Sequence, residues 1–192
     1  GGFDWYKDKI TKYKNDASEG AHASNTAFYL QDKIDLTKNW NITPGLRYDH
    51  HSNFGGHLSP SLSLGFKKNE KTNFYFNYKE FFVAPNLYQL NAAYYGNKNL
   101  DPEEGYTFEF GVNHEFDDTL SGTFNIFRQH AKNRIIYDFA ASKYANTGNM
   151  NSMGFSVTLD KKLNKYWSAG IGYTYLHINA LLSLIHISRA HE

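Results

Sequence analysis

The sequence predicts an all-β fold: part of an antiparallel up-and-down transmembrane β-barrel, with about nine strands, short periplasmic turns and long extracellular loops. Three observations predict it. Bulky apolar and small polar residues alternate through segments about ten residues long, the 192 residues include 15 Phe, 15 Tyr and 3 Trp, and short polar connections alternate with longer ones. Alternation with period two indicates strands, because successive side chains of a strand point to opposite faces.

The alternation is clearest in HLSPSLSLGFK, residues 57–67. One face of this segment carries bulky residues, namely Leu58, Pro60, Leu62, Leu64 and Phe66. The opposite face carries small or polar residues, mainly Ser59, Ser61, Ser63 and Gly65. The segment therefore predicts a strand with one apolar side.

The same pattern predicts the other strands. In chain order they lie at residues 3–12, 26–36, 41–49, 73–79, 107–113, 120–126, 155–160 and 167–175. Asp32 interrupts the apolar face of the second of these, and the bulky residues move from even to odd positions after a loop at residues 140–153. Most segments approach the ~9 to 11 residues that a tilted strand needs to cross a bilayer. No stretch keeps a helical periodicity.

The connections between these segments are of two kinds. The short ones are polar, as tight hairpin turns require, and read TKNW, KNEK, FDDT and LNKY. The long ones are rich in Gly, Asn and Ser and lie at residues 13–24, 50–56, 85–105 and 140–153. Short turns at one end and long loops at the other are typical of outer-membrane barrels.

A soluble antiparallel sandwich or ligand-binding barrel also alternates, but its bulky face points inward and its polar face meets water. Here the polar faces carry Ser, Gly, Asn and Thr more than Lys and Glu, whereas a solvated face usually carries more charge. Aromatic residues near the strand ends suit the two interfacial girdles of a membrane barrel. They are Trp5, Tyr29, Trp40, Tyr48, Tyr166, Trp167 and Tyr175. Both features favour the membrane barrel.

Composition excludes several other classes of protein. The net charge of +1 does not favour nucleic-acid binding, and the absence of cysteine excludes a disulfide or thiolate–metal framework. No run approaches the roughly 20 apolar residues of a membrane helix. We find no nucleophile elbow, phosphate loop or zinc-protease motif, so we expect a non-enzymatic protein without catalytic residues, cofactor or metal site. The start, GGFDWYKDKI, has no initiator Met or signal region, so we expect a piece of a longer chain.

Two motifs frame the third long loop. The first is a Phe-Arg-Ala-Pro-like box with Phe82, Val83, Ala84 and Pro85, and the second is an Asn-Pro-Asn-Leu-like box with Asn97, Asn99, Leu100, Pro102 and Glu103. This pair resembles the paired boxes of TonB-dependent outer-membrane receptors. FYLQDKIDLTKNWNITPGLRYD, HLSPSLSLGFK and YANTGNMNSMGFSVTLDKKL resemble further segments of that family, in the family's order, over about residues 25–178.

The resemblance implies a Gram-negative outer-membrane protein, with residues 1–180 forming part of a 22-stranded barrel that is plugged by an N-terminal domain of the same full-length chain. Its function would be the TonB-energised import of a scarce nutrient, such as an iron chelate, haem or cobalamin. Its partners would be outer-membrane lipid, the plug, the TonB complex and that ligand. The apolar run at residues 181–192 breaks the alternation and is interpreted as a non-native tail, with a native strand or buried edge as the alternative. A passive porin-like channel is the alternative function, and a soluble ligand-binding barrel a weaker one.

The third long loop supplies the candidate ligand-binding residues, because its aromatic side chains can stack on a flat ligand and its amides can hydrogen-bond one. These residues are Asn86, Tyr88, Gln89, Asn91, Tyr94 and Tyr95. The residues of the two boxes are interpreted as mainly architectural, since Pro85 lacks the N–H that a sheet ladder needs. The loop contains no histidine, which argues against haem ligation there. His22, His50, His51 and His57 are interpreted as solvent-exposed residues in or beside loops, with haem or metal binding as the alternative.

Overall fold

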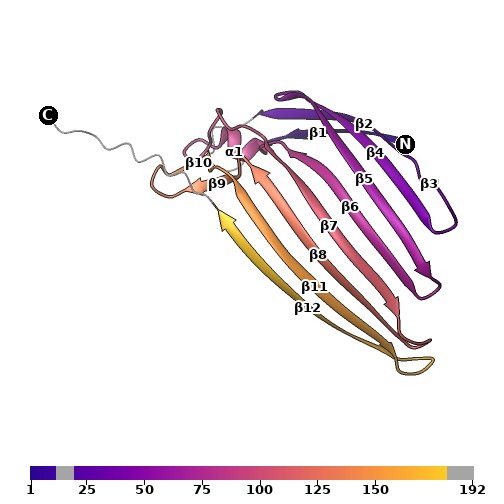
Figure 1. Cartoon of the computed structure of the whole chain (residues 1–192). Helices are drawn as coiled ribbons and strands as arrows, with labels where there is room; N and C mark the ends of the chain where they lie inside the picture. Colours follow the sequence, from indigo (N-terminus) through magenta and orange to yellow (C-terminus); the bar gives the residue numbers. More distant parts are fainter. Residues whose placement is uncertain (12–19, 181–192) are drawn as a thin grey trace.

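The structure, a computed structural model, describes residues 1–11 and 20–180. It is a long, curved antiparallel sheet in which each long strand pairs with the long strands next to it in the chain (Figure 1). The nine long strands are β1 (Gly2–Lys9), β2 (His22–Gln31), β4 (Trp40–His51), β5 (Gly55–Asn69), β6 (Thr72–Val83), β7 (Glu103–Glu115), β8 (Leu120–Lys132), β11 (Met150–Lys162) and β12 (Ser168–Ala180). Within the described residues, β1 and β12 are the two edges and the barrel is not closed.

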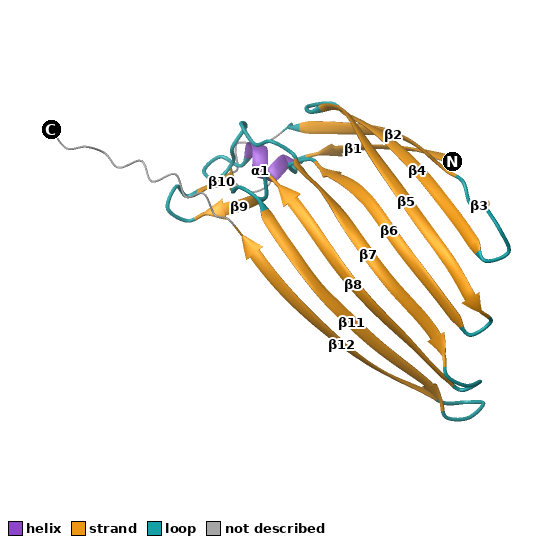
Figure 2. Cartoon of the chain, in the orientation of Figure 1, coloured by secondary structure: helices purple, strands orange, loops and turns teal. Residues whose placement is uncertain are grey.

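Four short elements complete the fold. β3 (Ile34–Asp35) pairs with β4, β9 (Ile135–Asp138) pairs with β10 (Lys143–Asn146), and α1 (Leu87–Asn91) is a five-residue helix. Figure 2 shows α1, β9 and β10 gathered at one end of the sheet, which we call the loop end; tight hairpins occupy the opposite, turn end. Among the described residues no helix is long and apolar enough to span a membrane.

The strand register collects the bulky residues into continuous rows. One row crosses seven strands and consists of Ile42, Leu64, Phe76, Phe110, Ile126, Phe155 and Tyr175, each directly opposite the next. The adjacent row, one residue away on each strand, consists of Asn41, Gly65, Tyr75, Gly111, Asn125, Ser156 and Thr174. Since neighbouring residues of a strand face opposite sides, the sheet has one apolar face and one largely polar face.

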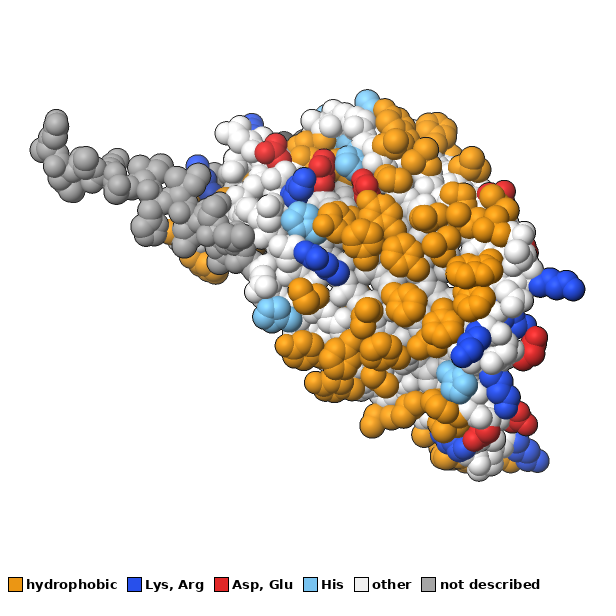
Figure 3. Space-filling view, viewed as in Figure 1, with side chains coloured by type: hydrophobic (Ala, Val, Ile, Leu, Met, Phe, Trp, Pro, Cys, Tyr) orange, Lys and Arg blue, Asp and Glu red, His pale blue; other side chains and the backbone are white. Residues whose placement is uncertain are grey.

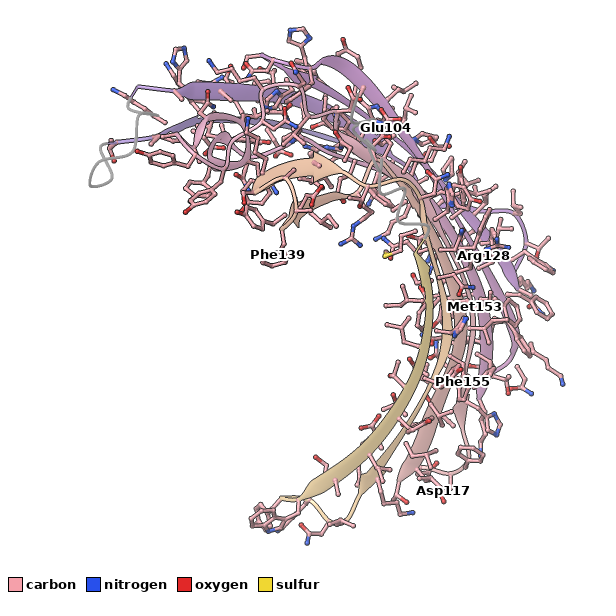
Figure 4. The ribbon with its side chains drawn as sticks, turned by 90° about the vertical axis from the view of Figure 1, so that its left-hand side faces the viewer. Glu104, Asp117, Arg128, Phe139, Met153 and Phe155 are labelled. Carbon is pink, nitrogen blue, oxygen red and sulfur yellow. The ribbon has the colours of Figure 1, made fainter. Side chains whose placement is uncertain are left out.

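The apolar face is the convex face of the sheet. Figure 4 shows Met153 and Phe155 on the convex side, and Figure 3 shows hydrophobic side chains in a broad band across that face, with charged groups gathered toward its two ends. Bulky side chains in the band are exposed, such as Phe110 at 44% and Ile126 at 48%. The bulky rows therefore do not form a dry interior. The predicted membrane-barrel fold is confirmed, whereas the soluble alternative would place these rows inward.

Three of the hairpin turns use the same side-chain device. The side-chain oxygens of Thr37, Asp117 and Asn164 each accept hydrogen bonds from the backbone N–H groups two and three residues later, at 2.7–3.2 Å. Such local bonds specify a tight turn between two strands. At Asp117, the Thr119 hydroxyl, then the backbone amides and the Lys161 ammonium, lower the pKa of the carboxyl to about 2. The predicted short turns are confirmed at these positions.

Two predicted strand boundaries were wrong. The expected strand at residues 26–36 is split between β2 and β3 at Asp32 and Lys33, opposite Pro44 in β4. Proline has no N–H to donate to the ladder, which explains the break. The expected loop at 50–56 is a turn of only three residues, because β4 continues to His51 and β5 begins at Gly55.

The expected girdle also needs one correction. Tyr29 lies opposite Arg47, and the Arg47 guanidinium sits 5.9 Å from the centre of its ring. Both residues therefore belong to the polar, concave face rather than to an interfacial girdle. The expectation that the four histidines are exposed loop residues was wrong, because His22, His50, His51 and His57 all lie in strands. His51 is buried against Phe54 at the end of β4, and His57 is partly buried and stacks on Phe82.

The last long loop is also different from the expectation. β8 continues to Lys132 and β11 begins at Met150, so the connection spans residues 133–149 rather than 140–153. It contains the β9–β10 hairpin, which begins just after Asn133, a residue with a positive φ of 54°. The predicted tail at residues 181–192 lies outside the described residues.

Candidate functional site

The first part of the candidate site is α1 and the residues that begin it. Asn86 is the N-cap: its side-chain oxygen accepts from the Gln89 N–H at 2.8 Å, and the Gln89 side-chain oxygen accepts from the Asn86 N–H at 2.9 Å. This reciprocal capping box satisfies two N–H groups at the start of the helix. The Asn91 amide donates to the Leu87 carbonyl at 3.0 Å. These amides thus hold the local fold, although Asn86 remains exposed and Gln89 partly exposed.

The second box fastens this loop to the β9–β10 hairpin. The Asn97 amide donates to the Tyr144 carbonyl at 2.9 Å, and the Tyr144 N–H donates to the Tyr95 carbonyl at 2.9 Å. The Glu103 carboxylate accepts from the Ile135 N–H at 2.8 Å. These bonds bring together segments about 40 residues apart in the chain.

A small apolar core supports the same junction. Leu90, Leu100 and Ile135 are buried together, with Phe54 and Tyr144 packed against them. Leu100, the last residue of the Asn-Pro-Asn-Leu-like box, is only 2% exposed. Asn146 adds a reciprocal pair of hydrogen bonds with the backbone of Asp101, at 2.8 and 2.9 Å. The loop and the hairpin therefore dock as one unit, and the box residues hold the docked geometry.

On this unit the tyrosines form an aromatic cluster at the loop end. The cluster consists of Tyr88, Tyr94, Tyr95, Tyr137, Phe139 and Tyr144, with neighbouring ring centres 5.1–6.3 Å apart and mostly edge-to-face. Its outermost rings are strongly exposed: Tyr94 at 76% and Phe139 at 86%. Figure 4 shows Phe139 projecting on the concave side of the sheet. Exposed rings held at fixed positions offer stacking surfaces to an aromatic or flat ligand.

The structure thus brings together Tyr88, Tyr94 and Tyr95, the three aromatic candidates. It also adds residues that the sequence analysis missed, Tyr137, Phe139 and Tyr144, all from the β9–β10 hairpin. The dense aromatic spacing of YDFAASKY is the signal that could have pointed to them.

The first box borders a small cavity. The cavity has a volume of about 230 Å³ and is lined by Phe82, Ala84, Pro85 and Asn86, together with polar residues of β1, β2 and β4 that include Asp8, Asn25, Asp49 and His51. The Phe82 ring also stacks on His57, with centres 4.5 Å apart. This box therefore joins the loop unit to the first strands of the sheet.

Two polar networks cover the concave face below the loops. In one, Arg47 donates to Asp49 at 2.8 Å and to Asp4 at 2.8 Å, and Asp49 also accepts from Asn25. In the other, the Glu109 carboxylate accepts from Asn125 at 2.8 Å and from Tyr75 and Asn77 at 3.3 Å. The described residues contain no group of three or more His, Asp or Glu side chains placed to hold a metal. The concave face therefore offers a polar wall.

Comparison with known proteins identifies the family. A family model described as "TonB dependent receptor-like, beta-barrel" matches residues 1–188. The chain belongs to the TonB-dependent receptor family. As a TonB-dependent receptor barrel, it is 32% identical over 152 residues to the ferric enterobactin receptor PirA of Pseudomonas aeruginosa, and 30% identical over 183 residues to PiuA of Acinetobacter baumannii, a probable TonB-dependent siderophore receptor.

Solved receptors share the same architecture. The crystal structure of the siderophore receptor PirA from Pseudomonas aeruginosa matches 93% of this chain with a TM-score of 0.82 and 29% identity, and the chain covers 36% of it. A complex of the ferric enterobactin receptor PfeA with enterobactin, from the same species, matches 81% of this chain with a TM-score of 0.71 and 26% identity; 27% of PfeA is covered. In the sequence alignments, the chain spans only 20% of the full length of PirA and 24% of PiuA. TonB-dependent receptor barrels are outer-membrane proteins.

Proposed function

We propose that this chain forms part of the barrel of an outer-membrane receptor that imports an iron–siderophore complex with energy from the TonB complex. The curated relatives support this assignment, since PirA is a ferric enterobactin receptor and PiuA a probable siderophore receptor. The structural observation that carries it is the aromatic cluster, which stands over the concave side of a barrel-type sheet. In the intact protein a plug domain of the same chain occupies the space on that concave side.

The site suggests a division of labour. Tyr94 and Phe139, the most exposed rings, make the first contact with the ligand, and Tyr88 and Tyr95 extend the same surface. Asn86, Gln89 and Asn91 hold α1 in place and present their remaining hydrogen-bonding atoms to the ligand. The polar concave face, with Arg47 and Glu109, meets the plug domain. We propose a non-enzymatic role, because capture and passage require binding surfaces and no bond in the ligand need be broken.

The decisive experiment is uptake by cells that carry the complete gene. Accumulation of radioactive iron is measured from ferric enterobactin and other iron chelates, in cells with and without a functional TonB complex. Haem and labelled cobalamin are tested as alternative substrates in the same cells. Uptake of an iron chelate that disappears without TonB supports the proposal. Uptake that persists without TonB indicates the passive channel, and selective uptake of haem or cobalamin refutes the siderophore assignment.

A further inference from the structure

The convex face carries a groove that the proposed import function does not use. Its volume is about 740 Å³. Its walls are mostly apolar and include Phe76, Phe108, Ile126, Met153, Phe155 and Tyr175. Arg128 and His177 also line it, and Figure 4 shows Arg128 on the convex side above Met153. The groove is therefore apolar with an arginine at one end, and it lies on the outer face of the barrel-type sheet.

The strand register shows where this arginine lies. Phe108, Arg128, Met153 and His177 form one cross-strand row. The next row toward the turn end is Phe110, Ile126, Phe155 and Tyr175, which is entirely bulky. The next row toward the loop end is Tyr106, His130, Asn151 and Asn179, which is polar, and His130 is hydrogen-bonded to Asn151 at 2.9 Å. Arg128 therefore marks the boundary between the apolar band and the polar end of the face.

The charge of Arg128 is not matched by a nearby carboxylate. The ion pairs and side-chain hydrogen bonds found among the described residues do not include Arg128, which is exposed. Glu104 lies opposite Lys132 and 3.5 Å from His57, and Glu80 accepts from the Tyr78 hydroxyl. Glu109 borders the groove, but its carboxylate is bound to Asn125 in the polar network of the concave face. The acidic groups near the groove thus have other partners.

We propose that this groove binds a membrane lipid with a phosphate headgroup, its acyl chain lying along the apolar walls and its phosphate against Arg128. An unpaired arginine facing a membrane is costly unless it meets an anion, and guanidinium matches phosphate geometry with two parallel hydrogen bonds. His177, in the same row, supplies a second donor to the phosphate. The inference rests on the proposed membrane location of the convex face and is independent of the imported substrate.

The test uses the full-length receptor, purified in detergent and examined by native mass spectrometry. Two probes with identical acyl chains are compared: dioleoyl phosphatidate and dioleoylglycerol, which lacks the phosphate. The wild-type protein is expected to retain phosphatidate about tenfold better, the size of effect expected of a charged hydrogen bond. Arg128→Gln should abolish that preference and Arg128→Lys should keep part of it. Lys161→Gln, which removes a cation at the turn end of the same face, is the matched control and should behave as wild type.

The outcomes are distinct. Equal retention of the two probes by the wild-type protein, or an unchanged preference in Arg128→Gln, overturns the proposal. If Arg128→Gln does not fold, as judged by heat-modifiable gel mobility, Met153→Trp decides, because filling the groove should lower retention of both lipids. A lipid-free dimer that Met153→Trp disrupts would instead assign the groove to a protein contact. Iron uptake measured on the same variants separates this proposal from the import function, since either result can fail alone.

Discussion

The amide of Asn97 donates a 2.9 Å hydrogen bond to the backbone carbonyl of Tyr144, which lies 47 residues further along the chain. Through this bond the second family box reaches the β9–β10 hairpin and sets the position of the tyrosines around it. The aromatic cluster is therefore held in part by Asn97, which is not one of its rings.

Asn97→Ala in the full-length receptor is expected to loosen this docking by about 1 to 3 kcal/mol, because it leaves a partly buried carbonyl without its donor. The measurement is hydrogen–deuterium exchange at the Tyr144 amide, which donates to Tyr95. Asn99→Ala is the control, because Asn99 is exposed and uses only its backbone N–H in the box. Equal exchange in the two variants would show that the side-chain bond does not hold the hairpin.

Leu62→Arg should destabilise the barrel by about 2 to 4 kcal/mol, because the proposed membrane location places the convex face against hydrocarbon. Ser63→Arg, one residue along β5 on the polar face and opposite Thr43 and Asn77, should cost far less. Urea unfolding of the two full-length variants in lipid vesicles gives the comparison. Similar losses of stability would contradict the assignment of the two faces.

The turn at Asp117 is expected to weaken in acid. The pKa of its carboxyl is lowered from 3.8 to about 2 in the folded protein. The ionised carboxyl therefore stabilises the folded state fully at pH values above the unfolded pKa of 3.8, and this contribution disappears as the pH falls through about 2. The stability difference between wild type and Asp117→Asn should therefore shrink between pH 5 and pH 2. Asn164→Asp provides the converse test, since it puts a titratable group into the equivalent turn and should introduce a pH dependence. A difference that stays constant down to pH 2 would exclude this role for Asp117.

Removal of one exposed ring of the aromatic cluster should weaken ligand capture. Tyr94→Ala and Phe139→Ala are each expected to raise the Kd for ferric enterobactin by about 2- to 12-fold, which corresponds to about 0.5 to 1.5 kcal/mol per stacked ring. Tyr166→Ala is the matched control, because that ring is 78% exposed but lies in a turn at the opposite end. Binding of radiolabelled complex to whole cells gives the Kd values. An identical loss in the control would point to a general effect on folding.

The sequence was sufficient for the sheet because the register repeats one simple rule. In residues 57–67 every second side chain is bulky, and this alone predicts which side of β5 is apolar; the same rule carried through the long strands gives the correct faces. The rule failed where a residue on a neighbouring strand determined the local structure. Asp32 interrupts the alternation of one predicted strand, but the strand breaks there because of Pro44 on the neighbouring strand. The periodicity of one segment carries no information about its neighbour.

The candidate site was less predictable for a similar reason. Tyr88, Tyr94 and Tyr95 stood out because they share one loop, whereas Tyr137 and Phe139 join them only through the docking of a second segment. The hairpin that carries those rings begins with Ile135, Ile136 and Tyr137, an apolar run without alternation, so no strand was predicted there. The contacts that align the two loops are made by single side chains, chiefly Asn97 and Glu103, whose partners cannot be read from spacing.

Within the described residues, each long strand between the edges β1 and β12 is bonded to the long strands before and after it in the chain, and at least three of the hairpins close with their own side-chain bond. A two-strand hairpin can therefore be added or deleted without changing how the other long strands pair, because they pair only with strands nearby in the chain. Barrels of different circumference are accessible by duplication of such units within a gene. The strand order therefore allows a barrel of this kind to change size by gaining or losing whole hairpins.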